Sequence, residues 1–549
     1  MPTVQGCLTC RLRRKKCSGE HPVCSRCTQL NVTCLGYGAK PLWMDGGLRE
    51  KEGLEKIRKK VKLTTDGQRR SRALQGMRKG VQKTPSKDLD SGAIVREQGE
   101  PRPDLDQALT SPLLSQTLPN GSISDSQPLL PWVHDPQLES FLLMHYLDFV
   151  FPAQFPFYSP DASQGGRGWY LGLLMRSKPL YNAALTLAAY HHRKTSCCKD
   201  FHGGGRDGFE GFYSSALNGL RDRVGKLSKK KLREGLKDSI EVLACVVQLI
   251  MFDVARGGFE DWQAHLRATP DIHPFLETYC TDSSMRTISR SSRGDIPDLR
   301  DLSFIDHAAM EFFSSVILHL DILACASTGK GPQYADICAA ALGDGDSKVR
   351  LDRIMGCENW IMVLIREIAV LGHSTRKNRQ LRNGLSMSEM EAAKVIERRL
   401  DSGLEQLSGI RSLENGTGRD CDLAVRKITE VYTHGAKLYL QVVVSGPCPQ
   451  LRESISGVSS TLAALRALPE PNLLRKTVWP FCIAGCMARV EHRQEFRELA
   501  SAVDINPSVF GSSWKALEVM ENCWRLRDEG GSVDWLGAMD DLGYRVLLV

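Results

Sequence analysis

The chain has 549 residues, more than one ordinary domain needs, and its 42% apolar content is enough for a sizeable core. Its formal net charge of +8 is unevenly spread: residues 1–83 hold 20 Lys and Arg against 6 Asp and Glu, a net +14, so the remainder carries −6. A basic segment on an acidic body favours binding to a polyanion. We find no signal peptide and no apolar run of transmembrane length, which argues against a secreted or membrane protein and predicts reduced cysteines.

Six of the 18 cysteines form a repeat near the N-terminus, with the spacing C-x2-C-x6-C-x6-C-x2-C-x6-C: Cys7, Cys10, Cys17, Cys24, Cys27 and Cys34. Each C-x2-C pair can present two thiolates to one metal ion, and each later cysteine adds a third. Two tetrahedral zinc ions need eight ligand positions, which six cysteines fill only if two sulfurs bridge both ions. The spacing therefore predicts a closed, structural cluster of two zinc ions with no open position for catalysis.

The first half of the repeat is strongly basic, and the second is not. Five cations follow Cys10 and are expected on one short helix: Arg11, Arg13, Arg14, Lys15 and Lys16. Residues 28–33, which follow Cys27, carry no charge. Some of these cations can balance the negative charge of the thiolates, but five exceed that need. A basic run on a helix is typical of contacts to phosphates and to the major groove.

These six cysteines and the basic run resemble the fungal binuclear zinc-cluster DNA-binding domain, which places a helix in the major groove. The resemblance implies that Cys7 and Cys24 are the bridging ligands. It also implies that Arg14 reads guanine in a CGG-like triplet, while Arg13, Lys15 and Lys16 mainly hold phosphates. We therefore expect residues 1–47 to form a zinc-cluster DNA-binding domain with its connector.

Residues 48–131 differ in composition from the segments on either side. Residues 48–83 are predicted to be a basic arm with a short helix, whose apolar seam (Leu54, Ile57 and Val61) is too short for a coiled coil. Its basic clusters fit a nuclear-localisation or phosphate-contact role, or simply a solvated charge run. Residues 84–131 are rich in Pro, Ser, Asp, Gln and Gly and predict a disordered linker.

Residues 132–549 are predicted to form a large all-α domain, because helical periodicity recurs and strand-like alternation is scarce. An apolar helix over 141–150 is expected to be broken by residues 151–158. Loops are expected at 268–300 and 327–348. Further helices are expected near 207–226, 233–255, 302–326, 349–372, 387–407, 421–445, 454–467, 473–500 and 512–526.

Several segments of this region resemble a fungal-specific transcription factor domain of the second type. The similar segments are residues 145–157, 165–169, 356–360, 439–446 and 479–485, together with the connector at 36–47. The resemblance implies a helical regulatory domain. With the zinc cluster, it covers most of the chain except the linker.

Two further patterns invite a sharper interpretation. Gly165-Gly166-Arg167-Gly168 lacks the lysine and serine of a phosphate loop, so a tight turn before a helix is favoured. His191-His192 lie near Cys197-Cys198, but a surface histidine pair with buried thiols is favoured over a metal site. We find no recognisable catalytic motif, so we do not expect an enzyme.

The sequence thus predicts a nuclear, sequence-specific DNA-binding transcription regulator with two zinc ions. From the resemblance, its pathway would be metabolic or a secondary-metabolite gene cluster. The expected partners are double-stranded DNA and the transcription machinery or co-regulators, with no membrane; homodimerisation through the body stays open. One alternative is a nuclear scaffold whose zinc module contacts protein rather than DNA. The other is an enzyme in the helical body.

Overall fold

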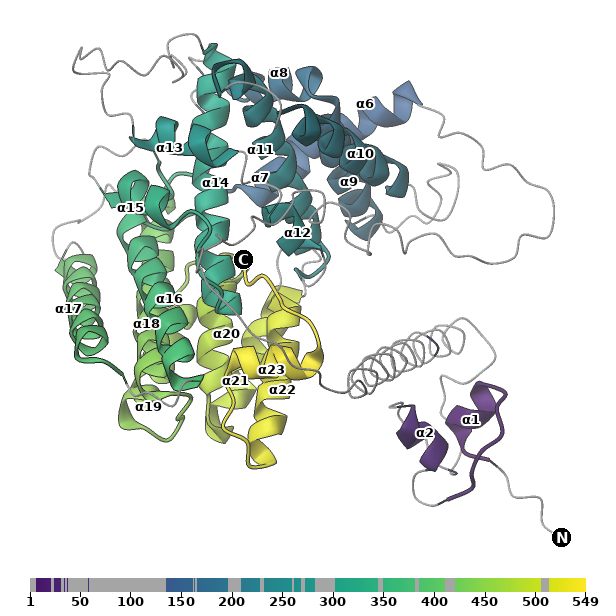
Figure 1. Cartoon of the computed structure of the whole chain (residues 1–549), viewed down its shortest axis with the longest axis vertical. Coiled ribbons are helices and arrows are strands. Elements are labelled where there is room, and N and C mark those ends of the chain that lie inside the picture. The colour runs from purple at the N-terminus through teal and green to yellow at the C-terminus, as the bar shows by residue number, and fades with distance from the viewer. Residues whose placement is uncertain are drawn as a thin grey trace, which may run out of the picture. The chain divides into compact units, whose positions relative to one another are not determined.

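The computed structural model of the chain describes residues 6–20, 24–30, 34, 37, 58, 135–160, 162, 165–195, 209–227, 232–258, 261–267, 272–281, 302–343, 349–380, 385–409, 420–504 and 513–549. The chain divides into two compact units, Met1–Pro101 and Arg102–Val549. Throughout the described residues the regular elements are helices (Figure 1), which confirms the predicted mostly-α class. Three predictions lie outside the described residues: the linker at 84–131, the seam of Leu54, Ile57 and Val61, and the pair Cys197-Cys198.

In residues 6–30 of the N-terminal unit, as far as they are described, two short helices begin in the same way, α1 (Leu8–Leu12) and α2 (Ser25–Gln29). The Cys10 backbone N–H donates to Cys7 Sγ at 3.4 Å, and the Cys27 backbone N–H donates to Cys24 Sγ at the same distance. Each C-x2-C pair therefore opens a helical turn that brings its two sulfurs together. Four of these cysteines are fully buried, so this unit is organised around thiols rather than around aliphatic side chains.

The C-terminal unit is a helical body in which α14 (Phe304–Thr328) is the central element (Figure 1). This helix packs against α8 (Gly168–Arg176), α11 (Leu232–Ala255) and α16 (Asn359–Gln380). By length and composition α14 could cross a membrane, contrary to our expectation that the chain has no such run. However, 89% of its apolar window is buried in the body, so it is a core helix.

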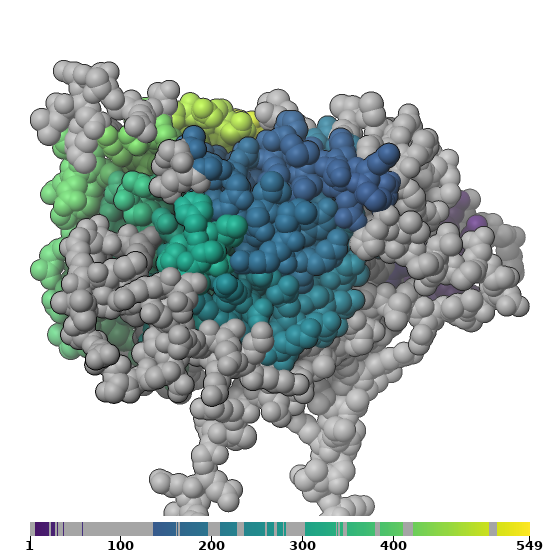
Figure 2. All heavy atoms as spheres, turned by 90° about the horizontal axis from the view of Figure 1, so that it is seen from above, coloured from purple at the N-terminus to yellow at the C-terminus, as the bar shows by residue number. Residues whose placement is uncertain are grey.

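The remaining helices surround α14 in two groups. Figure 2 shows the blue and teal helices of residues 135–281 on one side of the body and green helices near residue 400 on the other. The first group comprises α6 (Pro136–His145), the π-helix η1 (Tyr146–Val150), α7 (Phe151–Gln154), α9 (Lys178–Thr195), α10 (Glu210–Leu227), α12 (Trp262–Arg267) and α13 (His273–Thr281), followed along the chain by α15 (Ala335–Gly343). The second comprises α17 (Met387–Gly409), α18 (Asp420–Ser445), α19 (Arg452–Arg466), the 3-10 helix η6 (Pro471–Lys476), α20 (Val478–Met487), α21 (Val490–Asp504), α22 (Ser513–Asp528) and α23 (Trp535–Leu542).

Several predicted boundaries were wrong. The helix expected to break at Phe151 continues to Gln154, because η1 joins α6 to α7 with helical backbone angles at Val150 and Phe151. The loops expected at 268–300 and 327–348 contain α13 and α15. The single helix expected over 473–500 is divided into η6, α20 and α21. All ten residues of α20 are buried, so its sequence carries no amphipathic period to mark its ends.

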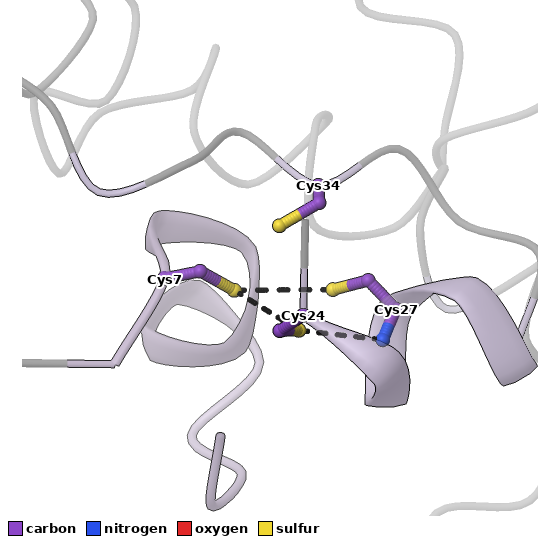
Figure 3. A group of neighbouring side chains, drawn as sticks. All are labelled: Cys7, Cys24, Cys27 and Cys34. Atoms are coloured by element: carbon purple, nitrogen blue, oxygen red, sulfur yellow. Dashed lines mark hydrogen bonds between the residues drawn. The ribbon is translucent and has the colours of Figure 1, made fainter. Parts of the chain in front are cut away.

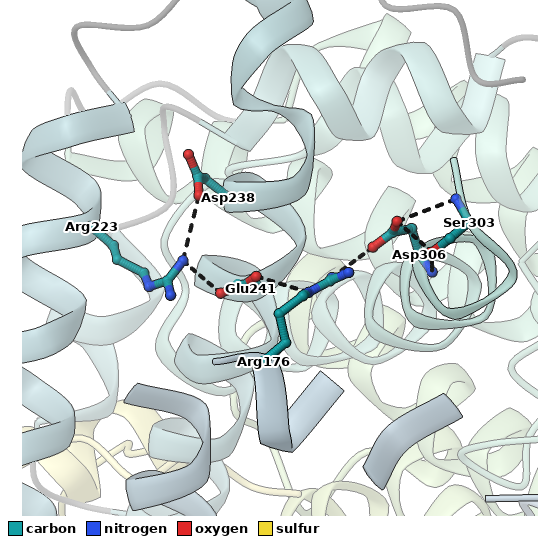
Figure 4. A network of polar contacts seen from close by, with 6 residues as sticks. All are labelled: Arg176, Arg223, Asp238, Glu241, Ser303 and Asp306. Atoms are coloured by element: carbon teal, nitrogen blue, oxygen red, sulfur yellow. Dashed lines mark hydrogen bonds and ion pairs between the residues drawn. The ribbon is translucent and has the colours of Figure 1, made fainter. Parts of the chain in front are cut away.

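A network of charged side chains joins four helices of the body (Figure 4). Arg176 of α8 lies 3.0 Å from Glu241 of α11 and 2.6 Å from Asp306 of α14. Arg223 of α10 contacts the same Glu241 at 2.6 Å. Asp306 also accepts hydrogen bonds from Ser303, which caps the start of α14. Because the carboxylates of Glu241 and Asp306 are buried and each pairs with Arg176, loss of that arginine would leave buried charge uncompensated.

Candidate metal centre and nucleic-acid interface

The six cysteines of the repeat bring their sulfurs into two overlapping groups of four. One group is Cys7, Cys10, Cys17 and Cys24, and the other is Cys7, Cys24, Cys27 and Cys34. Within each group the four Sγ atoms lie within 4.8 Å of one another, and Figure 3 shows the second group from close by. Two cysteines, Cys7 and Cys24, belong to both groups.

The spacing of the sulfurs suits tetrahedral zinc. Cys7 Sγ lies 3.6 Å from Cys24 Sγ and 3.9 Å from Cys27 Sγ, and Cys10 Sγ lies 3.8 Å from Cys24 Sγ. Four thiolates at roughly 2.3 Å from a zinc ion are separated by roughly 3.8 Å. Each group supplies four soft donors, which is the ligand set that zinc takes in closed structural sites.

Protons compete with zinc for these sulfurs, and the strength of the competition differs between the cysteines because their pKa values are shifted differently. Burial raises the pKa of the thiols of Cys7, Cys10 and Cys27. Burial acts in the same direction on Cys17, but hydrogen bonds from Tyr37 and from the backbone of Cys7 and Gly19 outweigh it and lower its pKa to about 6. Because zinc binds the thiolate, loading the buried sulfurs must release protons.

The five cations of the first half do not share one helix, which corrects our prediction. The helix α1 ends at Leu12, so it holds only Arg11, and Arg13 is its C-terminal cap. Arg14 has a left-handed backbone, with a φ of 53°. Its N–H donates to Arg11 O at 3.0 Å, and the Lys15 N–H donates to Cys10 O at 2.9 Å. This pair of bonds is a Schellman motif, which satisfies the last carbonyls of the helix and turns the chain away from its axis.

Four of the five cations are exposed, namely Arg11, Arg14, Lys15 and Lys16. Arg13 is half-buried against the module. The turn at Arg14 therefore presents a cluster of exposed cations at the end of α1 rather than a stripe along its side.

Two functional candidates were missed by sequence reasoning. Arg26 lies inside the second C-x2-C pair and is exposed. With Lys16 it lines a shallow pocket that also contains the hydroxyl-bearing side chains of Ser18 and Ser25. Arg26 could have been noticed as the one basic residue between Cys24 and Cys34, but its position beside Lys16 is a result of the fold.

The second missed residue is Tyr37, three positions after the last cysteine. Its hydroxyl lies 3.4 Å from Cys17 Sγ and donates to Glu20 O at 2.9 Å. No spacing rule connects residues 17 and 37, so their contact could not be inferred from the pattern of residues.

Comparison with known families decides what the two units are. Residues 141–549 match the fungal specific transcription factor domain, and residues 5–43 match the fungal Zn(2)-Cys(6) binuclear cluster domain. The chain belongs to the fungal-specific transcription factor family. Its zinc-cluster domain binds two zinc ions through six cysteines, which confirms the predicted cofactor. Zinc-cluster domains bind DNA, so this transcription factor carries a DNA-binding module at its N-terminal end.

Several characterised fungal regulators are similar to this transcription factor. It is 29% identical to the pestheic acid cluster transcriptional regulator 3 of Pestalotiopsis fici, over 99% of this chain and 98% of that protein. It is 31% identical to the trichothecene biosynthesis transcription regulator TRI10 of Trichoderma arundinaceum, over 71% of this chain and 92% of that protein. It is 28% identical to the ustiloxin B cluster transcription factor ustR of Aspergillus flavus, over 99% of this chain and 98% of that protein. No solved structure matches this chain.

The other patterns singled out in the transcription factor's sequence lie in its body. Gly165 and Gly166 have φ values of 85° and 58°, and the Gly168 N–H donates to Gly165 O, which confirms a tight turn before α8. His191 is buried, and its Nδ1 lies 2.9 Å from His145 Nε2. Burial lowers the pKa of His191 to about 4. Among the described residues of the body, no group of three or more potential ligands gathers as the cysteines do.

Proposed function

We propose that this transcription factor is a nuclear, sequence-specific regulator of one biosynthetic gene cluster. The observation that carries the proposal is the exposed cation cluster held at the end of α1 by the zinc-binding sulfurs. The relatives support the pathway part, because their names assign them to the pestheic acid, trichothecene and ustiloxin B pathways. In this proposal residues 1–47 dock on DNA and residues 48–83 add phosphate contacts. Residues 84–131 are the linker, and residues 132–549 form the regulatory domain.

All six cysteines of the repeat are proposed to be zinc ligands, with Cys7 and Cys24 bridging the two ions. The overlap of the two four-sulfur groups at these residues supports the assignment. When bound, the two ions supply folding free energy to a module that has little aliphatic core. The protein's own contribution is the pair of capped turns that aligns Cys7 with Cys10 and Cys24 with Cys27.

The DNA contacts are proposed to divide into base reading and phosphate binding. Arg14 is proposed to donate to O6 and N7 of a guanine in a CGG-like triplet, because a guanidinium fork suits that base edge. Arg11, Arg13, Lys15 and Lys16 are proposed to hold phosphates. Arg26 joins them: two cations and two hydroxyls around one shallow pocket suit a phosphate of the DNA backbone.

Two rival functions remain testable alternatives. A nuclear scaffold that uses its zinc module for protein contacts would bind DNA weakly and without sequence preference. A catalytic body is not supported by the family, whose relatives are named as transcription regulators.

We propose two kinds of protein partner for the regulator. One is a set of co-regulators, and the other is a second copy of this chain, bound through the helical body.

Genome-wide occupancy mapping of the tagged chain tests the proposal as a whole. We expect peaks concentrated in the promoters of one biosynthetic cluster, each with a CGG-like triplet, and loss of transcripts from that cluster on deletion. Occupancy without any shared motif, or nuclear recruitment that survives Arg14→Ala at every site, would favour the scaffold.

A further inference from the structure

Cys17 is the sulfur of the first group that is most open to solvent. Cys7, Cys10 and Cys24 are fully buried, whereas Cys17 is only half-buried and lines the pocket beside Lys16. A water, a chelator or an electrophile can therefore reach the first sulfur group most directly through Cys17. Its hold on the metal depends on the groups that surround its sulfur.

The Cys17 side chain is held by several neighbours. The Cys7 N–H donates to Cys17 Sγ at 3.4 Å, and the backbone of Gly19 also hydrogen-bonds to this sulfur. Gly6 passes so close that a Cβ there would lie 2.8 Å from Cys17 Cβ. The contact made by a side chain from the end of the module is the Tyr37 hydroxyl, 3.4 Å from Cys17 Sγ.

Tyr37 also ties two distant parts of the module together. The Tyr37 hydroxyl is 2.9 Å from Glu20 O, in the segment that joins the two halves of the repeat, and Tyr37 follows Cys34 of the second sulfur group by three residues. The Tyr37 hydroxyl thus connects the end of the second half of the repeat with Cys17, the third cysteine of the first half. The carbonyl oxygen of Glu20 and a Cys17 thiolate can both only accept, so the single hydroxyl proton of Tyr37 lies between two acceptors, and a three-centre hydrogen bond is the arrangement that serves both contacts.

We propose that Tyr37 is a positioning residue of the zinc cluster, whose hydroxyl stabilises the Cys17 thiolate and slows its release from the metal. A hydrogen bond to a metal-bound thiolate lowers its basicity and fixes its orientation, and loss of such outer contacts typically weakens metal binding by roughly 10–100-fold. The inference rests on the proposed ligand role of Cys17. It makes no use of DNA contacts, so its failure would leave the proposed regulator function untouched.

Cysteine-resolved alkylation of the zinc-loaded full chain tests this role. Wild type and Tyr37→Phe are treated with N-ethylmaleimide, and each modified cysteine is followed by mass spectrometry while zinc is counted by elemental analysis. We expect Cys17 in Tyr37→Phe to react roughly 10–100-fold faster than in wild type. The rate at Cys27, in the other sulfur group, should stay the same.

Tyr158→Phe is the matched control, since it also removes a hydrogen-bonded hydroxyl, the acceptor of Trp169 Nε1 at 2.8 Å, but in the helical body. It should leave every rate in the zinc module unchanged. Faster alkylation confined to Cys17 supports the inference, whether the Tyr37→Phe chain retains both zinc ions or loses one. Unchanged alkylation of Cys17, or an equal acceleration at all six cysteines, overturns it.

Discussion

Arg14 combines a strained backbone with a proposed base contact, and two substitutions separate these properties. Its φ of 53° is one that a side chain with a Cβ adopts at a cost of roughly 1–2 kcal/mol. Glycine has no such cost and is the preferred residue at this position of a Schellman motif. Arg14→Gly and Arg14→Ala both remove the guanidinium, but only the first relieves the strain.

We therefore expect the two variants to fail equally on DNA and to differ in zinc retention. Loss of the base contact should cost roughly 1–3 kcal/mol on the preferred site, or roughly 5- to 140-fold in Kd. Because metal binding and folding of the module are coupled, Arg14→Gly should withstand chelator better than Arg14→Ala, by roughly 1 kcal/mol or about fivefold in apparent zinc affinity.

The assay is a zinc-competition titration of each full-length variant beside a binding titration on specific and random duplexes. Equal chelator resistance of the glycine and alanine variants would refute the argument from backbone strain. Equal weakening on specific and random DNA would instead make Arg14 a phosphate contact.

Other consequences are open to measurement. Arg26→Ala should lower the slope of log K against log salt by roughly one on all DNA sequences, Arg26→Lys should restore it, and Arg398→Ala, an exposed cation of α17, should change nothing. Zinc should be lost as the pH falls, because protons compete for thiols whose pKa burial raises; zinc retention that is independent of pH would contradict this. Asp306→Asn should lower the melting temperature of the body more than Asp528→Asn, because the Asp306 carboxylate is buried, whereas that of Asp528, which pairs with Arg493, is exposed. Hydrogen bonds from Ser303 and Arg176 outweigh burial and lower the pKa of Asp306, so its contribution to stability is present above the ordinary Asp pKa and is lost as the pH falls below it, as thermal melts across acidic pH would reveal. Residues 1–83 should sediment as a monomer at micromolar concentration.

The sequence predicted the metal site well because the chemistry lies in a short, fixed spacing. Six cysteines at those intervals leave few arrangements that satisfy two tetrahedral ions, and the sulfurs gather accordingly. The backbone conformation of the residues between the cysteines was less predictable. The basic run from Arg11 to Lys16 favours a helix by composition, but the chain turns at Arg14 to satisfy the final carbonyls of α1, a local capping requirement that side-chain periodicity does not reveal.

The helical body shows the same contrast. Long amphipathic helices such as α17 and α18 were predicted to within a few residues, because one exposed face leaves a clear period. The short α13 and α15 were missed in predicted loops, since elements of nine residues carry little period of their own. Contacts between distant residues, such as Tyr37 with Cys17 and Arg26 beside Lys16, depend on the fold and could not be inferred from spacing.

The central claim is that the zinc module reads a guanine-containing triplet through Arg14, and selection from a randomised duplex library at two salt concentrations tests it most directly. With the zinc-loaded full chain we expect a CGG-like triplet to be enriched at both concentrations. With Arg14→Ala the triplet preference should vanish while salt-dependent binding to all sequences persists. Selection of no motif by the wild-type chain, or of the same triplet by Arg14→Ala, would contradict the account.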